Sequence, residues 1–264
     1  MTPFEEVIED LVAEHAALES VLVRLPDSAW DIPTHAPGWA VRDQVAHLAS
    51  VDETATLAIV DVAAFRANTG QRVAGEAPFL SKGRAMAPAE MLTWWRTASA
   101  ALVTAGRTLD PKARLPWFGP DMSAVSFLTA RLMECWSHGL DVVDVVGIER
   151  PPTDRLRHVV FLGLRTRSFS YTNRGLPPNE EPIRLELVSP SGAIWTYGDE
   201  GAANRITGPA VDFAEVTTQR RHPADTDLVI HGEAAEEWMS IAQAFAGPAG
   251  QGRQPGQFPK EARS

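Results

Sequence analysis

Apolar residues in the first part of the chain recur at intervals of three and four, which is the pattern of amphipathic helices. We expect four such helices, each of about 20 residues, at positions 3–25, 41–65, 88–109 and 123–146. Segments rich in proline and glycine separate them, at positions 26–38, 67–87 and 110–122. Four amphipathic helices with a long second connection predict a four-helix bundle, a fold that commonly holds metals between its helices.

The pattern changes after the Pro151-Pro152 pair. A fifth helix is expected at 154–169, and its arginines form either a solvated face or an anion-binding wall. Residues 183–188 then alternate between apolar and polar positions, and 193–198 are typical of a hairpin partner. Further elements are expected as a strand at 204–207, a helix at 209–219, a strand at 226–231 and a helix at 233–245.

The predicted fold class is therefore α + (α+β). A four-helix bundle is expected at 1–150, followed by a connecting helix and a small α+β domain at 151–246. The tail at 247–264 is rich in Gly, Pro, Gln and charge, so we expect it to be disordered.

Composition narrows the classes of partner. The net charge of −10 and the pI near 5.2 argue against a protein that binds nucleic acid or an anionic membrane. A single cysteine excludes an internal disulfide and fits a reducing compartment, so we expect a cytoplasmic protein. The sequence shows no signal peptide and no apolar stretch of about 18 residues that would span a membrane. It leaves a homodimer open.

Metal-ligand chemistry is suggested by the fourth predicted helix. Glu134 and His138 are four residues apart, so their side chains lie one turn apart on the same face. His47, on the second predicted helix, is the best donor of a third ligand. Two imidazoles and one carboxylate suit Zn²⁺ with an open position, although the same donors can hold Fe²⁺ or Ni²⁺. The alternative without a metal is that the Glu-x3-His spacing arises by chance and that His47 has a structural role.

Arg131 and Asp141 lie on or near the same helical face and are candidates for contacts that orient the ligands. Cys135 neighbours Glu134 but points about 100° away from it on a helix, so we expect it to be buried and inert. The chain has no Ser-His-Asp order, phosphate loop or dinucleotide fingerprint at a credible spacing.

Two motifs carry a family resemblance. Gly38-Trp39-x2-Arg42-Asp43-Gln44-x2-His47-Leu48 and the later Glu134-x3-His138-Gly139-x-Asp141 resemble the mycothiol-dependent maleylpyruvate isomerase family. That family belongs to the DinB-like superfamily of metal-binding four-helix bundles, and this chain looks most like an uncharacterised actinobacterial group within it. The resemblance implies that His47, Glu134 and His138 bind zinc. The segments 208–213 and 219–222 resemble part of a sterol-carrier-like domain, which implies that fold for the α+β half.

The resemblance also implies a low-molecular-weight thiol, such as mycothiol, as cosubstrate. Bound Zn²⁺ stabilises a thiolate, which can add to an activated alkene or open an electrophilic ring. Arg131, Arg220 or Arg221 would hold a carboxylate on the substrate or the thiol. Trp39 and Trp136 are candidates for the cavity wall, their alternative role being to pack the helix pair.

Three functions stay open at this point. The first is a metal-dependent, thiol-using transferase or isomerase that acts on a small electrophilic substrate. The second is a metal-dependent hydrolase on the same bundle, in which the open position activates water. The third is a non-catalytic protein that uses the metal as a structural clip and the α+β half to bind a ligand or a second subunit.

Overall fold

The computed structural model of the chain describes residues 2–69 and 77–258. The chain forms two compact units, Met1–Arg150 and Pro151–Ser264. The first is helical, and the second combines helices with a small mixed sheet, so the predicted α + (α+β) class is confirmed.

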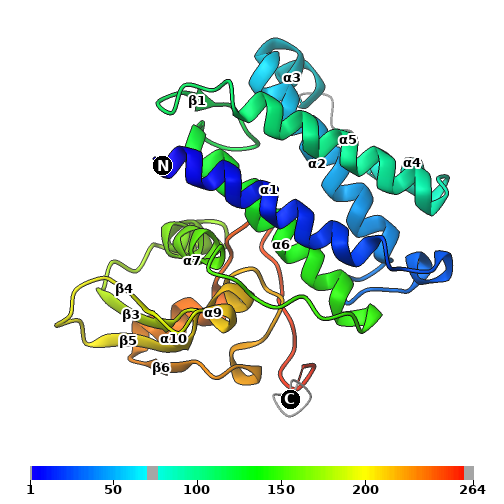
Figure 1. The fold of residues 1–264 in the computed structure, drawn as a ribbon. Coiled ribbons are helices and arrows are strands. Elements are labelled where there is room, and N and C mark those ends of the chain that lie inside the picture. The colour runs from blue at the N-terminus through cyan, green and yellow to red at the C-terminus, as the bar shows by residue number, and fades with distance from the viewer. Residues whose placement is uncertain (1, 70–76, 259–264) are drawn as a thin grey trace. The chain divides into compact units, whose positions relative to one another are not determined.

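The first unit is built on four long helices. These are α1 (Pro3–Leu22), α2 (Val41–Val60), α5 (Pro88–Gly106) and α6 (Ala124–Val146), which pack side by side (Figure 1). Local sequence sets their ends: the Thr2 hydroxyl accepts from Glu5 N, while the Glu5 carboxylate accepts from Thr2 N. The last of the four helices, α6, ends where Gly147 adopts a φ of 66°, a left-handed conformation that glycine tolerates.

The core of the bundle is continuous across all four helices. Buried side chains from each helix form one apolar cluster, which includes Leu18, Val45, Trp95 and Cys135. Cys135 is 1% exposed, in agreement with its predicted burial. The i, i+3, i+4 apolar pattern therefore placed the correct faces inward.

The structure departs from the predicted helix boundaries at the second connection. The helix expected at 41–65 ends at Val60, because the Asp61 carboxylate accepts from Ala64 N and starts a new helix, α3 (Val62–Thr69). A further short helix, α4 (Pro78–Arg84), lies within the segment expected to be a connection. Residues 70–76 of that segment lie outside the described residues.

Shorter elements complete the first unit. A 3-10 helix, η1 (Asp27–Asp31), precedes α2, and strands β1 (Arg114–Leu115) and β2 (Met122–Ser123) form a hairpin before α6. The predicted loops at 26–38 and 110–122 thus contain some regular structure.

The second unit begins with two helices where one was expected. These are α7 (Leu156–Arg165) and α8 (Arg167–Thr172). The break falls at Thr166, which has a φ of −94° and a ψ of 9° and whose hydroxyl donates to the carbonyls of Leu162 and Gly163. Such back-bonding by threonine bends or interrupts helices.

The sheet of this unit has the strand order β4-β3-β5-β6. The strands are β3 (Ile183–Val188), β4 (Ile194–Tyr197), β5 (Asn204–Pro209) and β6 (Val229–His231). β3 pairs antiparallel with β4 and parallel with β5, whereas β5 and β6 are antiparallel. The predicted hairpin is therefore present, and β6 is shorter than expected.

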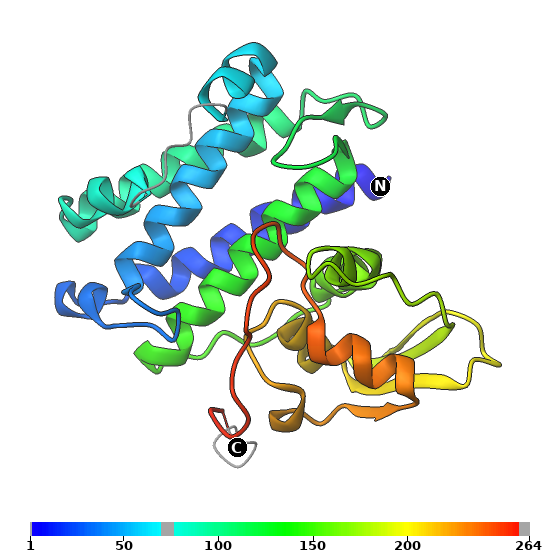
Figure 2. The same cartoon turned by 180° about the vertical axis from the view of Figure 1, so that it is seen from behind.

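Helices α9 (Ala210–Thr217) and α10 (Glu233–Ile241) pack on this sheet (Figure 2). Leu185 and Ile206 of the sheet are fully buried, as are Phe213 and Trp238, whose rings meet edge to face at 5.7 Å. A short 3-10 helix, η2 (Pro223–Asp225), lies between α9 and β6. The alternation of the strands thus buries one face of the sheet.

Residues 247–258 form neither helix nor strand, yet they make defined contacts within the second unit. The Asp225 carboxylate accepts from Gly256 N at 2.7 Å and from Phe258 N at 3.2 Å. The domain boundary at 246 and the disorder of the tail stay predictions, and residues 259–264 lie outside the described part of the chain.

Across residues 2–69 and 77–258, none of the helices combines the length and the apolar character that a membrane span requires.

Candidate metal centre

Helices α2 and α6 pack against each other and bring together the three predicted ligands. Glu134 and His138 lie one turn apart on α6, and His47 faces them from α2. His47 Nε2 is 3.3 Å and His138 Nε2 is 3.1 Å from the same atom, Glu134 Oε2. Among the described residues, these three side chains are the one group of His, Cys, Asp or Glu whose ligand atoms, all within 4.8 Å of one another, could hold a metal.

The electrostatics of this cluster favour an ionised Glu134. Burial raises the pKa of the carboxyl group, but hydrogen bonds from His138 and His47 lower it more, and the net pKa lies well below its usual range. The side chains of all three residues are between 13% and 20% exposed, so the cluster is largely shielded from water. One carboxylate and two imidazoles that converge in such surroundings fit Zn²⁺ or Fe²⁺.

His138 is oriented by a residue that the sequence analysis did not single out. Its Nδ1 lies 2.6 Å from Oε1 of Gln44, which is fully buried on α2. The predicted partner, Asp141, has its Oδ2 3.8 Å from the same nitrogen, beyond hydrogen-bond distance. The available signal was the position of Gln44 three residues before His47, on the same helical face.

Two partly buried aromatic side chains line the histidines. The Trp39 ring stacks on the His138 ring at 6.0 Å with an angle of 23° and lies 5.3 Å from the His47 ring. Phe79 meets the rings of Trp39 and His47 edge to face, at 5.6 and 5.4 Å. Trp39 was predicted as a wall residue; Phe79 was missed because it lies on α4, which the sequence analysis treated as a connection.

Arg131 lies three residues before Glu134 and is 4% exposed. Its guanidinium stacks on the Trp117 ring at 4.3 Å, and its Nε and Nη1 have no hydrogen-bond partner among the described residues. Burial lowers the pKa of this group, while the charges of Glu134 and Asp52 oppose that shift. Arg131 therefore places a positive charge near the Glu134 carboxylate.

Asp52 and His15 extend the polar interior away from the three ligands. His15 Nε2 is 3.9 Å from Asp52 Oδ2, and the His15 ring meets Trp95 edge to face at 5.9 Å. Burial raises the pKa of Asp52 to about 7 and lowers the pKa of His15 to about 4. Both groups are therefore neutral over most of the interval between these values, and His15 is a buried histidine of the bundle core.

The remaining predicted residues lie elsewhere in the chain. Trp136 is buried in the first unit, and its carbonyl accepts from Arg150 Nη2 at 2.6 Å. Arg220 and Arg221 belong to the second unit, directly after α9. Arg220 Nη1 donates to the Thr218 carbonyl, and the Arg221 guanidinium stacks on Phe258 at 4.0 Å. The roles proposed for these three residues stay predictions.

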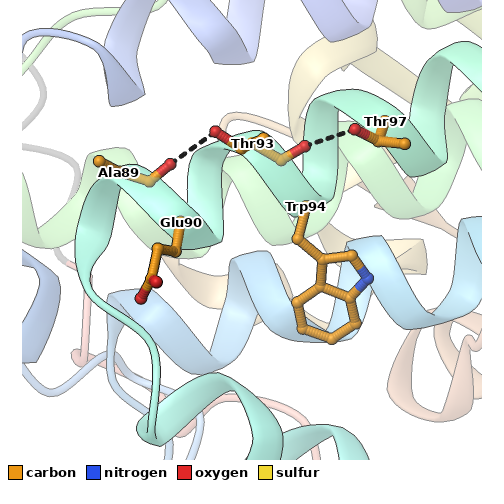
Figure 3. Close-up of a pocket in the computed structure, with 5 residues that line it drawn as sticks. All are labelled: Ala89, Glu90, Thr93, Trp94 and Thr97. Atoms are coloured by element: carbon orange, nitrogen blue, oxygen red, sulfur yellow. Dashed lines mark hydrogen bonds between the residues drawn. The ribbon is translucent and has the colours of Figure 1, made fainter.

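A shallow groove runs along α5, outside the histidine cluster. Figure 3 shows its lining residues, with Glu90 and Trp94 projecting on one side of the helix: Ala89, Glu90, Thr93, Trp94 and Thr97. The hydroxyl groups of both threonines donate to carbonyls of the helix itself. Glu90 is the one ionisable side chain in this lining, so the groove offers no cluster comparable to the three candidate ligands.

The described residues form a four-helix bundle, with two imidazoles and a carboxylate on two facing helices, and a small α+β unit. The family model for the mycothiol maleylpyruvate isomerase N-terminal domain matches residues 11–143. The chain belongs to this family, and the predicted membership is confirmed.

Two relatives match nearly the whole chain. Two uncharacterised proteins of Mycobacterium tuberculosis, MT0041 of strain CDC 1551 / Oshkosh and Rv0036c of strain ATCC 25618 / H37Rv, are each 43% identical over 250 residues. These matches cover 93% of this chain and 97% of each relative.

Solved structures show the same fold at low identity. The crystal structure of the mycothiol-dependent maleylpyruvate isomerase aligns with a TM-score of 0.55 and 17% identity, over 83% of this chain and 90% of that one. A histidine-to-alanine mutant of that enzyme aligns over the same shares, with a TM-score of 0.57. Both units of the chain thus take part in the shared fold.

Proposed function

We propose that this chain holds a divalent metal, zinc in the first instance, at His47, Glu134 and His138. We further propose that it uses a low-molecular-weight thiol such as mycothiol in a transferase or isomerase reaction on a small electrophilic substrate. The observation that carries the proposal is the convergence of two imidazole nitrogens on one carboxylate oxygen, at 3.3 and 3.1 Å, in a chain of this family.

The donor set fits a metal better than it fits a closed hydrogen-bond network. When a neutral His138 carries its proton on Nδ1, directed at Gln44, Nε2 has no proton to donate to Glu134. Two acceptors then lie 3.1 Å apart, and a bound cation would replace the hydrogen bond that His138 otherwise donates to Glu134. When bound there, zinc lowers the pKa of a thiol and stabilises its thiolate at neutral pH.

The neighbouring side chains would shape the rest of the reaction. Trp39 and Phe79 cover the imidazole faces, exclude water and offer an apolar wall to the thiol or the substrate. Arg131 supplies a buried positive charge near Glu134, which would stabilise negative charge that develops on the substrate. Asp141 would help to orient the ligands, Trp136 would line the cavity, and Arg220 and Arg221 would hold a carboxylate; these roles are part of the proposal.

The chemistry balances without an oxidant or a reductant. In an isomerisation, the thiolate forms a C–S bond at one carbon of an activated double bond, the π electron pair moves onto the activating group, and the substrate rotates about the resulting single bond. It then loses the thiolate, which restores the double bond in the other geometry. In a transfer, the C–S bond is kept, and the electrophile's leaving group or opened ring takes up the electron pair and a proton.

Metal analysis followed by a reaction panel tests the proposal. The purified protein is expected to retain about one zinc ion per chain, and the zinc-loaded protein to convert activated alkenes or open epoxides only when mycothiol is present. His47→Ala is expected to remain folded and to lose this reaction. Turnover without thiol would identify a hydrolase instead. Zinc that raises stability but supports no reaction would identify a structural metal.

A further inference from the structure

A directional hydrogen-bond chain connects a candidate ligand to the loop that precedes α2. The Thr34 hydroxyl lies 2.9 Å from the Trp39 carbonyl, Gln44 Nε2 lies 2.8 Å from the Thr34 hydroxyl, and Gln44 Oε1 lies 2.6 Å from His138 Nδ1. All four residues belong to the first unit, and Gln44, in the middle of this hydrogen-bond chain, is fully buried.

The far end of this chain sets the direction of every bond in it. A carbonyl oxygen only accepts, so the Thr34 hydroxyl donates to Trp39 and accepts from the amide group of Gln44. The Gln44 amide nitrogen is thereby placed on the Thr34 side and its oxygen on the His138 side. An amide oxygen also only accepts, and at 2.6 Å it lies closer to Nδ1 than the Glu134 carboxylate oxygen lies to Nε2, at 3.1 Å. This contact favours a neutral His138 with its proton on Nδ1 and its lone pair on Nε2.

Gln44 is also linked to the loop that carries Trp39. The loop is closed by a bridge between Pro33 and Ala40, and Trp39 accepts a second bond from Thr34 N at 2.7 Å. Its indole stacks on the very imidazole that Gln44 orients. Movement of the Gln44 side chain would therefore disturb both the ring of His138 and the loop that covers it.

We propose that Gln44 is a positioning residue, which fixes His138 in the Nδ1–H tautomer and couples it to the Trp39 loop. The consequence for metal binding rests on the proposed function, whereas the tautomer does not. An amide acceptor orients the imidazole without adding a second negative charge beside Glu134, unlike the carboxylate of Asp141, which lies 3.8 Å from the same nitrogen.

The tautomer is measured first, in the metal-free wild-type protein. Imidazole ¹⁵N NMR at alkaline pH, with the His138 signals assigned from a His138→Gln variant, is expected to show a protonated Nδ1 and an unprotonated Nε2. A neutral ring with its proton on Nε2 would overturn the proposal without any variant. This result does not depend on whether the protein binds zinc.

Two variants then test the two ends of the hydrogen-bond chain separately. Gln44→Leu removes the acceptor for His138 and is expected to lower zinc affinity by about 10–100-fold, measured by competition with a chelator. Thr34→Val removes the hydroxyl that links Gln44 to the loop but keeps the Gln44 amide that accepts from His138. Zinc affinity is therefore expected to fall less than in Gln44→Leu, while the indole environment, seen by ¹H–¹⁵N NMR of Trp39, changes. Gln44→Met is the substitute if Gln44→Leu fails to fold.

The outcomes distinguish this inference from the proposed function. If wild-type protein binds zinc and a folded Gln44→Leu or Gln44→Met variant binds it equally well, Gln44 does not position His138. If the wild-type protein binds no zinc but shows the Nδ1–H tautomer, the proposed metal site fails and the positioning of His138 by Gln44 stands.

Discussion

The guanidinium group of Arg150 occupies the space in which a side chain on Gly139 would lie. A Cβ atom built on Gly139 would overlap Arg150 Nη1 and lie 3.0 Å from its Cζ. Arg150 is held in place by Glu14, 3.3 Å from Nη1, and by the Trp136 carbonyl, and both charged side chains are buried. The glycine that follows His138 in the motif therefore makes room for a buried ion pair.

Gly139→Ala is expected to destabilise the first unit. Displacement of Arg150 would remove its ion pair with the buried Glu14 carboxylate, and breaking a buried pair costs about 3–5 kcal/mol. Partial relaxation of the arginine reduces this value, so we expect the free energy of unfolding to fall by about 2–4 kcal/mol, measured by urea denaturation.

A matched glycine and a double variant make this test specific. Gly119→Ala adds the same methyl group where no heavy atom lies within 4 Å, and it should change the free energy of unfolding by less than about 0.5 kcal/mol. In Gly139→Ala/Arg150→Ala the two losses should be clearly less than additive, because the clash is absent once the guanidinium is removed. Full additivity would contradict the steric explanation.

Zinc is expected to stabilise the wild-type protein through His47. At free zinc about 100-fold above the dissociation constant, linkage predicts an increase of about 2.7 kcal/mol in the free energy of unfolding. His47→Ala should lower zinc affinity by more than about 100-fold, since an outer contact alone is worth about 10–100-fold. His35→Ala is the matched control, because His35 lies outside the three candidate ligands. Equal stabilisation of the His47 variant by zinc would contradict the assignment.

Helical periodicity placed Glu134 and His138 on one face, and the family motif pointed to His47 on a second helix; that the three residues hold a metal stays a prediction. The sequence was not sufficient for Gln44 and Phe79. The bond from Gln44 to His138 depends on how α2 and α6 pack, and no single-helix pattern contains that relationship. Phe79 lies on a helix of seven residues, too short for a 3.6-residue period to stand out from a loop.

The pH dependence of stability should expose Asp52 and His15 as opposing groups in the metal-free protein. The native pKa of Asp52 is about 7, so between about pH 4 and 7 the native state keeps a proton that the unfolded state has lost. Its contribution to the free energy of unfolding therefore falls as pH rises through that window. The native pKa of His15 is about 4, so between about pH 4 and 6.5 only the unfolded state is protonated, and this contribution rises with pH.

Single variants should separate the two slopes, which nearly cancel from about pH 4 to 6.5 in the wild-type protein. With Asp52→Asn, the free energy of unfolding relative to wild type should rise by about 1.4 kcal/mol per pH unit across the Asp52 window. With His15→Gln, it should fall with a similar slope across the His15 window. Urea denaturation at a series of pH values measures both, and parallel pH profiles for all three proteins would exclude these pKa shifts.

Gly83 places the short helix α4 against α2 and so determines where Phe79 lies over His47. A Cβ atom on Gly83 would lie 2.6 Å from the Cβ of Ala46, and neither atom can rotate away. Gly83→Ala must therefore shift backbone, with an expected loss of about 1–3 kcal/mol in the free energy of unfolding. The ring contact between Phe79 and His47, now 5.4 Å between centroids, should loosen as α4 moves.

Ala46→Gly provides the compensating change for this pair. Alone, it should cost about 1 kcal/mol, since glycine weakens a helix interior. Combined with Gly83→Ala, it removes the obstructing methyl group, so the double variant should be more stable than Gly83→Ala alone. Zinc affinity should fall in Gly83→Ala, because Phe79 then shields His47 less well. It should recover in the double variant. A double variant that is less stable than either single one would show that Gly83 is not set by its contact with Ala46.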